Sequence, residues 1–301
     1  MAHESDRQTS KLVPVTTFRR IRTVVCVLSL AAALTAAAQQ GFGPLDPTPP
    51  KDISVEEIIQ RFGARETEFA QARENYVFRQ AVKVDTLDSD TGKVDGEYQQ
   101  VTDVTFNSQG KRDEHVVFAP QNTLERIMLQ QQDLDDFEHG FPFVLTKKDL
   151  PNFDIKYLGR QKIDELDTYV FSADPKNVDP KHRNFKGKVW VDQQDFQIVL
   201  IDGKIIPDDF RSGHENMSPP FTTYYEQVDG KYWFPTYTKA EANFHIPATK
   251  DSMTDDIHVR MTIRYSDYKQ FRSTSRIIFD GEDITDKGTP DKQAPTTSPS
   301  H

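Results

Sequence analysis

The chain has 301 residues, with 37 Lys and Arg against 47 Asp and Glu, a formal net charge of −10. A field of that sign repels polyanions, and no Lys/Arg cluster with interleaved aromatics occurs, so we expect no nucleic-acid partner. The length allows a large core in one or two domains.

The chain begins with a predicted secretory signal peptide, residues 1–38. A basic region at 18–22 precedes an apolar run at 23–38, in which Ala36 and Ala38 occupy the −3 and −1 positions of a cleavage site. This order is typical of an exported protein, and the alternative, an uncleaved anchor helix, would need a longer run. The only cysteine, Cys26, lies inside the leader. We therefore expect a periplasmic protein, cleaved near Ala38, without disulfide, cysteine-bound metal or permanent membrane anchor.

A Pro-rich linker is predicted at 39–52, a single domain at 53–283 and a disordered tail at 284–301. The domain opens with a predicted helix over 54–76. Ser54 and Glu57 form a capping box, and Val55, Phe62, Phe69 and Tyr76 recur every seven residues, which gives the helix an apolar stripe.

After the helix, the pattern changes to period two. Segments rich in Val, Ile, Tyr, Phe and Thr alternate with turn residues, and predict strands near 76–86, 97–107, 113–119, 124–129, 154–162, 167–173, 187–192, 196–202, 221–228, 231–242 and 257–268. A short helix is predicted at 131–140, around Leu134 and Phe137. Consecutive hairpins predict a mainly antiparallel β fold with helices, of the α+β class.

The hairpin at 187–204 carries apolar residues on both faces. Val189 and Val191 are expected on one face and Trp190 on the other. In its second strand, Phe196, Ile198 and Leu200 are expected on one face, with Val199 and Ile201 opposite. The strand at 257–268 instead alternates apolar with polar residues and predicts one wet face. The hairpin must therefore be covered on both sides by protein, membrane or a ligand.

Three segments resemble a known family: FKGKVWVDQQDFQIVLIDG (185–203), the preceding hairpin DIKYLGRQKIDELDTYVFSADP (154–175), and EQVDGKYWFPTYTKAEA (226–242). Together they are similar to the periplasmic outer-membrane lipoprotein-sorting group that includes LolA, LolB and RseB. The resemblance implies a curved, open half-barrel sheet with helices packed on its concave face. It also implies a hydrophobic cavity between sheet and helices, which in the carriers holds lipoprotein acyl chains.

No pattern in the chain predicts catalysis or a cofactor. GxSxG, a P-loop and paired metal-ligand spacing are all absent, and the acidic stretch at 133–139 is typical of a helix face. We therefore expect no enzyme activity. The candidate ligand-binding residues are apolar, with a structural core as the alternative role for each: Phe62, Phe69, Trp190, Phe196, Ile198, Tyr224, Trp233, Phe234 and Tyr237.

Together these features predict a periplasmic carrier or binding protein for a lipid or for lipoprotein acyl chains, in outer-membrane lipoprotein sorting. The alternative is an envelope sensor or scaffold of the RseB type, which binds protein partners without transporting lipid. A hydrolase with an acidic site is a third reading that rests only on the surplus of carboxylates.

Overall fold

The computed structural model describes residues 42–107, 111–129, 133–134, 136–137, 143–179, 183–207, 219–246, 255–271, 278–279 and 282–283. The predicted signal peptide, the predicted tail and most of the predicted helix at 131–140 lie outside the described residues. Within that helix, Leu134 is helical and Phe137 lies in a short π-helical stretch.

Helix α2 spans Val55–Arg73 and starts at the predicted cap. The Ser54 side chain accepts a hydrogen bond of 3.1 Å from the backbone N–H of Glu57, which is the first half of the capping box. The Glu57 carboxylate turns outward to Arg61. The helix ends earlier than predicted, because Tyr76 already belongs to the first strand and faces the core from there.

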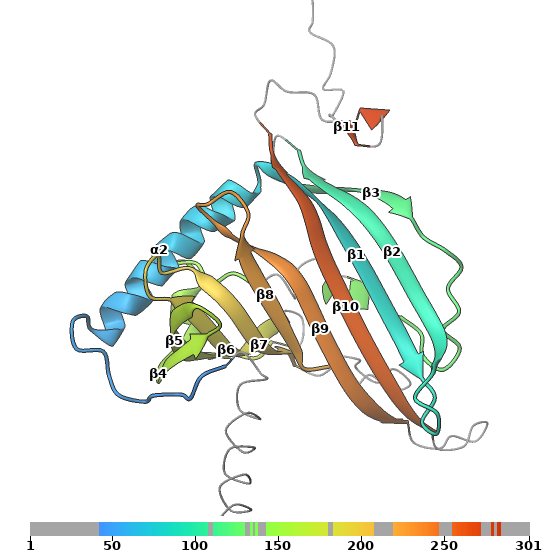
Figure 1. Ribbon diagram of the computed structural model, residues 1–301, viewed down its shortest axis with the longest axis horizontal. Helices are drawn as coiled ribbons and strands as arrows, with labels where there is room; N and C mark the ends of the chain where they lie inside the picture. Colours follow the sequence, from blue (N-terminus) through green and yellow to red (C-terminus); the bar gives the residue numbers. More distant parts are fainter. Residues whose placement is uncertain are drawn as a thin grey trace, which may run out of the picture.

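Ten strands form one open antiparallel sheet, which confirms the predicted sheet-dominated fold (Figure 1). They are β1 (Tyr76–Leu87), β2 (Val94–Phe106), β3 (Arg112–Phe118), β4 (Phe153–Ile163), β5 (Leu166–Pro175), β6 (Asn184–Asp192), β7 (Ile198–Ile206), β8 (Phe221–Gln227), β9 (Trp233–Ile246) and β10 (Asp255–Gln270). Their order is β3-β2-β1-β10-β9-β8-β7-β6-β5-β4, so β10 inserts between β1 and β9. A 3₁₀ turn, η4 (Leu150–Asn152), precedes β4, and β11 (Ile278–Phe279) pairs with β12 (Glu282–Asp283).

The prediction of a strand at 124–129 is wrong. Residues 121–129 form no strand but run beside β2, where the Thr123 hydroxyl accepts the Glu97 N–H at 2.9 Å. Arg126 then forms an ion pair of 2.9 Å with Asp95. The Thr123 N–H still donates to the Glu97 carbonyl at 2.9 Å, but its hydroxyl takes the place of a backbone acceptor, and no ladder continues from there.

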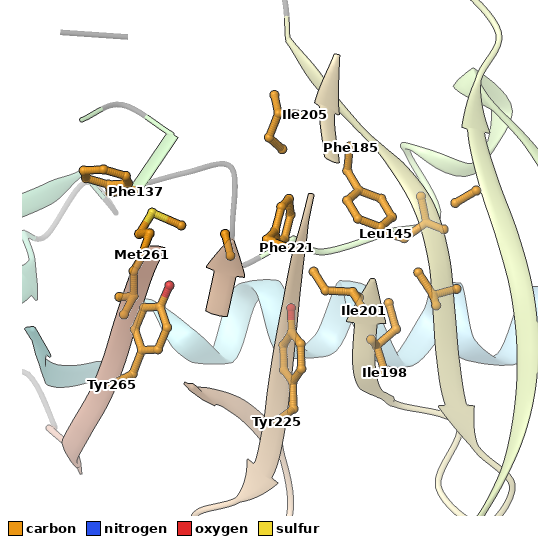
Figure 2. Close-up of a cluster of buried hydrophobic side chains, with 14 of the residues drawn as sticks. Phe137, Leu145, Phe185, Ile198, Ile201, Ile205, Phe221, Tyr225, Met261 and Tyr265 are labelled. Atoms are coloured by element: carbon orange, nitrogen blue, oxygen red, sulfur yellow. The ribbon is translucent and has the colours of Figure 1, made fainter. Parts of the chain in front are cut away.

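One face of the sheet carries the main core and packs against α2. Ile58 and Phe62 of the helix are fully buried, and the Phe62 ring lies 5.5 Å from that of Phe171 on β5. Figure 2 shows Ile198, Ile201, Tyr225 and Tyr265 in this cluster, with the helix running behind it. Gly63 permits close approach of η4, since a Cβ there would stand 2.6 Å from the Leu150 side chain. We call this the helix face of the sheet.

The β6–β7 hairpin is covered on both sides, as predicted, but its second strand has a different alternation. A bulge shifts the register between Trp190 and Val191, so that Trp190 pairs with Leu200 and Val191 with Ile198. Ile198 and Ile201 therefore both join the helix face, whereas Leu200 lies with Trp190 in a second cluster. The predicted grouping of Phe196, Ile198 and Leu200 is wrong, because a bulge inserts a residue and breaks the period of two.

Residues 42–46, expected to belong to a free linker, are anchored to the edge strand β4. Gly43 donates a backbone hydrogen bond of 2.7 Å to Lys162, and Asp46 and Arg160 exchange two of 2.8 Å each. Gly159 adopts φ +152°, and a Cβ there would stand 2.5 Å from the carbonyl oxygen of Asp46, so glycine allows this approach. The segment passes beneath β4 to α2 in Figure 1.

Candidate binding groove

A groove of about 630 Å³ opens on the face of the sheet away from α2, which we call the outer face. Its size lies within the range of small-molecule sites in proteins, roughly 300–1,000 Å³. Its apolar lining comes from β4 to β8 and from the anchored segment: Phe42, Leu45, Leu158, Val170, Trp190, Leu200 and Tyr224. By contrast, the hollow on the helix face beside Val84, Phe137 and Met261 measures about 20 Å³, enough for about one water molecule.

The floor of the groove belongs to one row of side chains, Trp190, Leu200 and Tyr224, which continues beyond the groove lining to Tyr237 on β9. Trp190 on β6 is opposite Leu200 on β7, Leu200 is opposite Tyr224 on β8, and Tyr224 is opposite Tyr237 on β9. Directly opposed residues of antiparallel strands point to the same face. The register therefore assembles a continuous apolar and aromatic surface from residues spread along the sequence.

The anchored N-terminal segment forms one wall. The ring of Phe42 meets Trp190 edge-on, with centroids 6.2 Å apart. Trp190 donates its indole N–H to the side-chain oxygen of Gln161 at 2.8 Å, and the Gln161 amide donates to the Gly43 carbonyl at 2.8 Å. Both polar ends of Gln161 are thus used to hold Trp190 and the segment together.

A polar row borders the apolar floor. Lys188, Asp202, Thr222 and Lys239 are opposed in turn across β6 to β9, and all four line the groove. The Thr222 hydroxyl donates to Asp202 at 2.8 Å. The Lys239 ammonium lies over the Tyr224 ring, 5.5 Å from its centroid. The groove therefore offers an apolar surface on one side and charged groups on the other.

The turn between β6 and β7 fixes α2 to the sheet. Glu66 accepts the Ile198 N–H at 3.1 Å, and Arg65 donates to the Asp195 carbonyl at 3.1 Å. Burial raises the pKa of Glu66 to about 8, against the opposing effect of the Ile198 hydrogen bond. Asp195 also accepts from the indole N–H of Trp233 at 2.8 Å, which joins β9 to the same turn.

The nine predicted binding residues do not line one cavity. Phe62 and Ile198 lie in the core of the helix face, with Phe196 at its margin, where its ring sits under Arg61. Phe69 and Phe234 form a separate cluster with Tyr76 and Tyr232. Trp233 packs between the helix-face core and the outer-face cluster. Only Trp190, Tyr224 and Tyr237 fall together, in the row on the outer face.

Of the residues that line the groove, the sequence predicted only Trp190 and Tyr224 as binding residues and missed the others. Phe42 and Leu45 stand in a Pro-rich segment that resembles a tether, and nothing local reveals that it pairs with β4. Lys188 and Lys239 look like ordinary wet-face residues of their strands. Counting cross-strand partners from the turns could have aligned Lys188 with Asp202, because the hairpin turn is explicit.

The described part of the chain shows neither a metal site nor a membrane-spanning helix. Among these residues, no group of three His, Cys, Asp or Glu side chains is placed to hold a metal ion. No described helix is long and apolar enough to cross a bilayer.

Comparison with known proteins assigns no family. No protein-family model matches the chain, and no curated protein sequence matches it either. A solved structure described as MucB in complex with MucA(peri) aligns over 71% of this chain and 99% of that chain, at 8% sequence identity and a TM-score of 0.21. At that TM-score, function has to be argued from the residues themselves.

Proposed function

We propose that this protein is a non-enzymatic binding protein of the periplasm that holds the acyl chain of a lipid or lipoprotein in the outer-face groove. The observation that carries the proposal is the groove itself, floored by Trp190, Leu200 and Tyr224 and walled by Phe42. The predicted signal peptide supports export, and the resemblance to the lipoprotein-sorting group supports an acyl ligand. In this proposal, a curved sheet of the half-barrel type presents its site on the face away from α2.

An acyl chain suits the face of a sheet better than an extended peptide does. The backbone donors and acceptors of β6, β7 and β8 are used in the ladders between neighbouring strands. A peptide lying across this face would find few partners for its own backbone, and unpaired buried polar groups are costly. An acyl chain needs only apolar contact, worth about 0.8 kcal/mol for each buried CH₂ group. Ten fully buried groups would contribute about 8 kcal/mol, within the range of about 4 to 15 kcal/mol that association costs, so the affinity depends on how much of the chain the groove covers.

The helix face is less suited to the ligand than the resemblance implied. Ile58, Phe62, Phe171 and Ile201 are fully buried there by contacts with one another and their neighbours. Opening that interface would expose apolar core and remove the Glu66 hydrogen bond to Ile198. The outer face already has an open groove, in which Phe42, Leu45 and Tyr224 are partly exposed and Leu200 and Val170 lie beneath at 1% exposure.

The experiment is ligand binding by the exported protein and two matched variants. Leu45, 46% exposed, lines the groove, whereas Val228, 39% exposed, lies in the β8–β9 turn and does not line it. We expect native mass spectrometry after mild purification to show a co-purifying lipid. We also expect Leu45→Glu to weaken binding of a fluorescent fatty acid at least about ten-fold, since a charge in an apolar wall costs more than 1.4 kcal/mol.

Val228→Glu should leave fatty-acid binding unchanged. Absence of both co-purifying lipid and fatty-acid binding would contradict the proposal. Equal loss of affinity in the two variants would contradict the assignment to the groove.

A second candidate function, recognition of a protein partner in the envelope, is favoured by the edge strand β3. Val116, Val117 and Phe118 are 48%, 37% and 50% exposed there, which is unusual for the edge of a sheet. An extended segment of an envelope protein could add to β3 as a further strand. Crosslinking in cells tests this: a partner captured by the unaltered chain and lost with Val117→Lys supports it, and an unchanged pattern contradicts it.

A further inference from the structure

Basic side chains on the outer face fall into two groups. Most are paired with carboxylates: Lys83 contacts Asp85 at 2.8 Å and Glu97 at 2.7 Å, and Lys156 contacts Asp154 at 2.8 Å. One row of directly opposed residues crosses the sheet from β4 to β2 and contains Lys83, Lys156 and Lys239. Its members are residues 156, 172, 188, 202, 222, 239, 262, 83 and 99. Ion pairing is thus the usual arrangement on this surface.

Lys239 and Arg264 depart from this arrangement. Lys239 lies over the Tyr224 ring, and the Arg264 guanidinium lies over the Tyr237 ring, 5.2 Å from its centroid. The two tyrosine rings are themselves neighbours, with centroids 6.3 Å apart. Within the described part of the chain, neither cation forms an ion pair with a carboxylate. Lys239 lines the groove, and Arg264 lies diagonally beyond it on the next strand. In a protein with ten more acidic than basic residues, two such adjacent cations beside a groove are a specific feature.

The register places these two cations within reach of one anionic group. Arg264 is directly opposite Tyr237, and Lys239 follows two positions along β9 on the same face. Diagonal neighbours of this kind stand about 7–8 Å apart at the backbone, which flexible Lys and Arg side chains span easily. The tyrosine rings hold both cations by cation–π contact and carry apolar surface toward the groove floor.

Two acidic groups lie near this pair and keep their charge. Asp202, across Thr222 from Lys239, accepts the Thr222 hydroxyl. Glu241, two residues beyond Lys239 on the same strand, contacts His258 at 2.6 Å. Lys188, on the far side of Asp202, adds a third cation to the groove. Positive charge therefore outweighs negative charge at this end of the groove.

We propose that the ligand is an anionic amphiphile, whose carboxylate or phosphate head binds between Lys239 and Arg264 while its acyl chain lies along Tyr224, Leu200 and Trp190. This inference rests on the proposed function and adds the chemistry of the head group. A charge-assisted hydrogen bond at a partly dry site is stronger than a neutral one, so the two cations set a preference for anions.

The test compares three probes with sixteen carbons each: palmitate, hexadecyl phosphate and the neutral hexadecanol. We expect the unaltered protein to bind both anions at least about ten-fold more tightly than the alcohol. Lys239→Gln and Arg264→Gln should each reduce this preference several-fold and leave alcohol binding unchanged. Lys156→Gln, in the same row but paired with Asp154 and outside the groove, is the matched control and should behave as the unaltered chain does.

Each outcome has a separate meaning. Equal affinity for the anions and the alcohol would overturn the head-group assignment and leave the proposed function standing. Absence of binding by all three probes would overturn both. Displacement of palmitate by inorganic phosphate at the same concentration would show that the site binds a free anion, and would overturn the proposal that the ligand is an amphiphile. Circular dichroism of the variants checks that these exposed substitutions leave the fold intact.

Discussion

At the scale of single residues, Glu66 is a buried acid whose pKa lies far above its ordinary value. It sits on the buried side of α2, 3% exposed, and its carboxyl oxygen accepts the N–H of Ile198 at the start of β7. Burial raises its pKa from 4.5 to about 8, so the side chain is largely protonated at neutral pH in the folded protein. Helical spacing places Glu66 on the apolar stripe, four residues after Phe62 and three before Phe69, but spacing alone gives neither its hydrogen-bond partner on β7 nor its pKa.

This pKa predicts a pH-dependent stability that Glu66→Gln removes. The unfolded chain loses the Glu66 proton near pH 4.5, whereas the folded chain keeps it until about pH 8. The contribution to stability is therefore complete below pH 4.5 and is lost as pH rises through 8, by about 1.4 kcal/mol per pH unit. Glutamine keeps an acceptor for Ile198 and cannot ionise, so urea unfolding at pH 5.5, 7 and 8.5 should show the variant gaining stability relative to the unaltered chain.

Glu68→Gln is the control, because Glu68 lies on the solvent side of the same helix in a surface pair with Arg65. Its effect on the free energy of unfolding should stay below about 1 kcal/mol at each pH. Parallel pH profiles for the unaltered chain and Glu66→Gln would contradict a buried, protonated Glu66.

At the scale of elements, periodicity gave the type of most strands and missed what depends on distant partners. The cap of α2 and the buried side of β10 (Ile257, Val259, Met261) follow from local pattern, and both are confirmed. The β6–β7 bulge does not follow from the local pattern. A shift of one residue depends on how Trp190 and Leu200 pack against the rest of the sheet. The anchoring of residues 42–46 also depends on a strand more than a hundred positions away.

The anchored segment should protect the edge of the sheet. The Arg160 N–H donates to the Asp46 carbonyl at 2.8 Å, so amide hydrogen exchange at Arg160 should be slow in the unaltered chain. Replacing residues 42–46 by a Gly-Ser sequence should make it exchange at least about ten-fold faster and leave the inner strand β6 unchanged. An unchanged Arg160 rate would mean that this pairing does not protect the edge.

At the scale of the whole molecule, the sequence predicted a two-sided apolar hairpin, and the family resemblance implied an acyl site between helix and sheet, whereas our proposal puts the site on the outer face. Aromatic residues at strand spacing look alike whether they face a core or a groove, so three of the nine candidates fell in the row on the outer face and six elsewhere. Telling the outer-face residues from the core residues required the strand order, in particular the insertion of β10 beside β1, and the register of the four strands from β6 to β9.

The most direct test of the central claim is to map where a fatty acid with a photoreactive acyl chain attaches to the protein. The groove predicts adducts on Phe42–Leu45 and on the outer-face residues Trp190 and Tyr224, competed by unlabelled palmitate. Adducts on α2, at Ile58 or Phe62, with none on residues 42–45, would place the chain in the helix face and contradict the account.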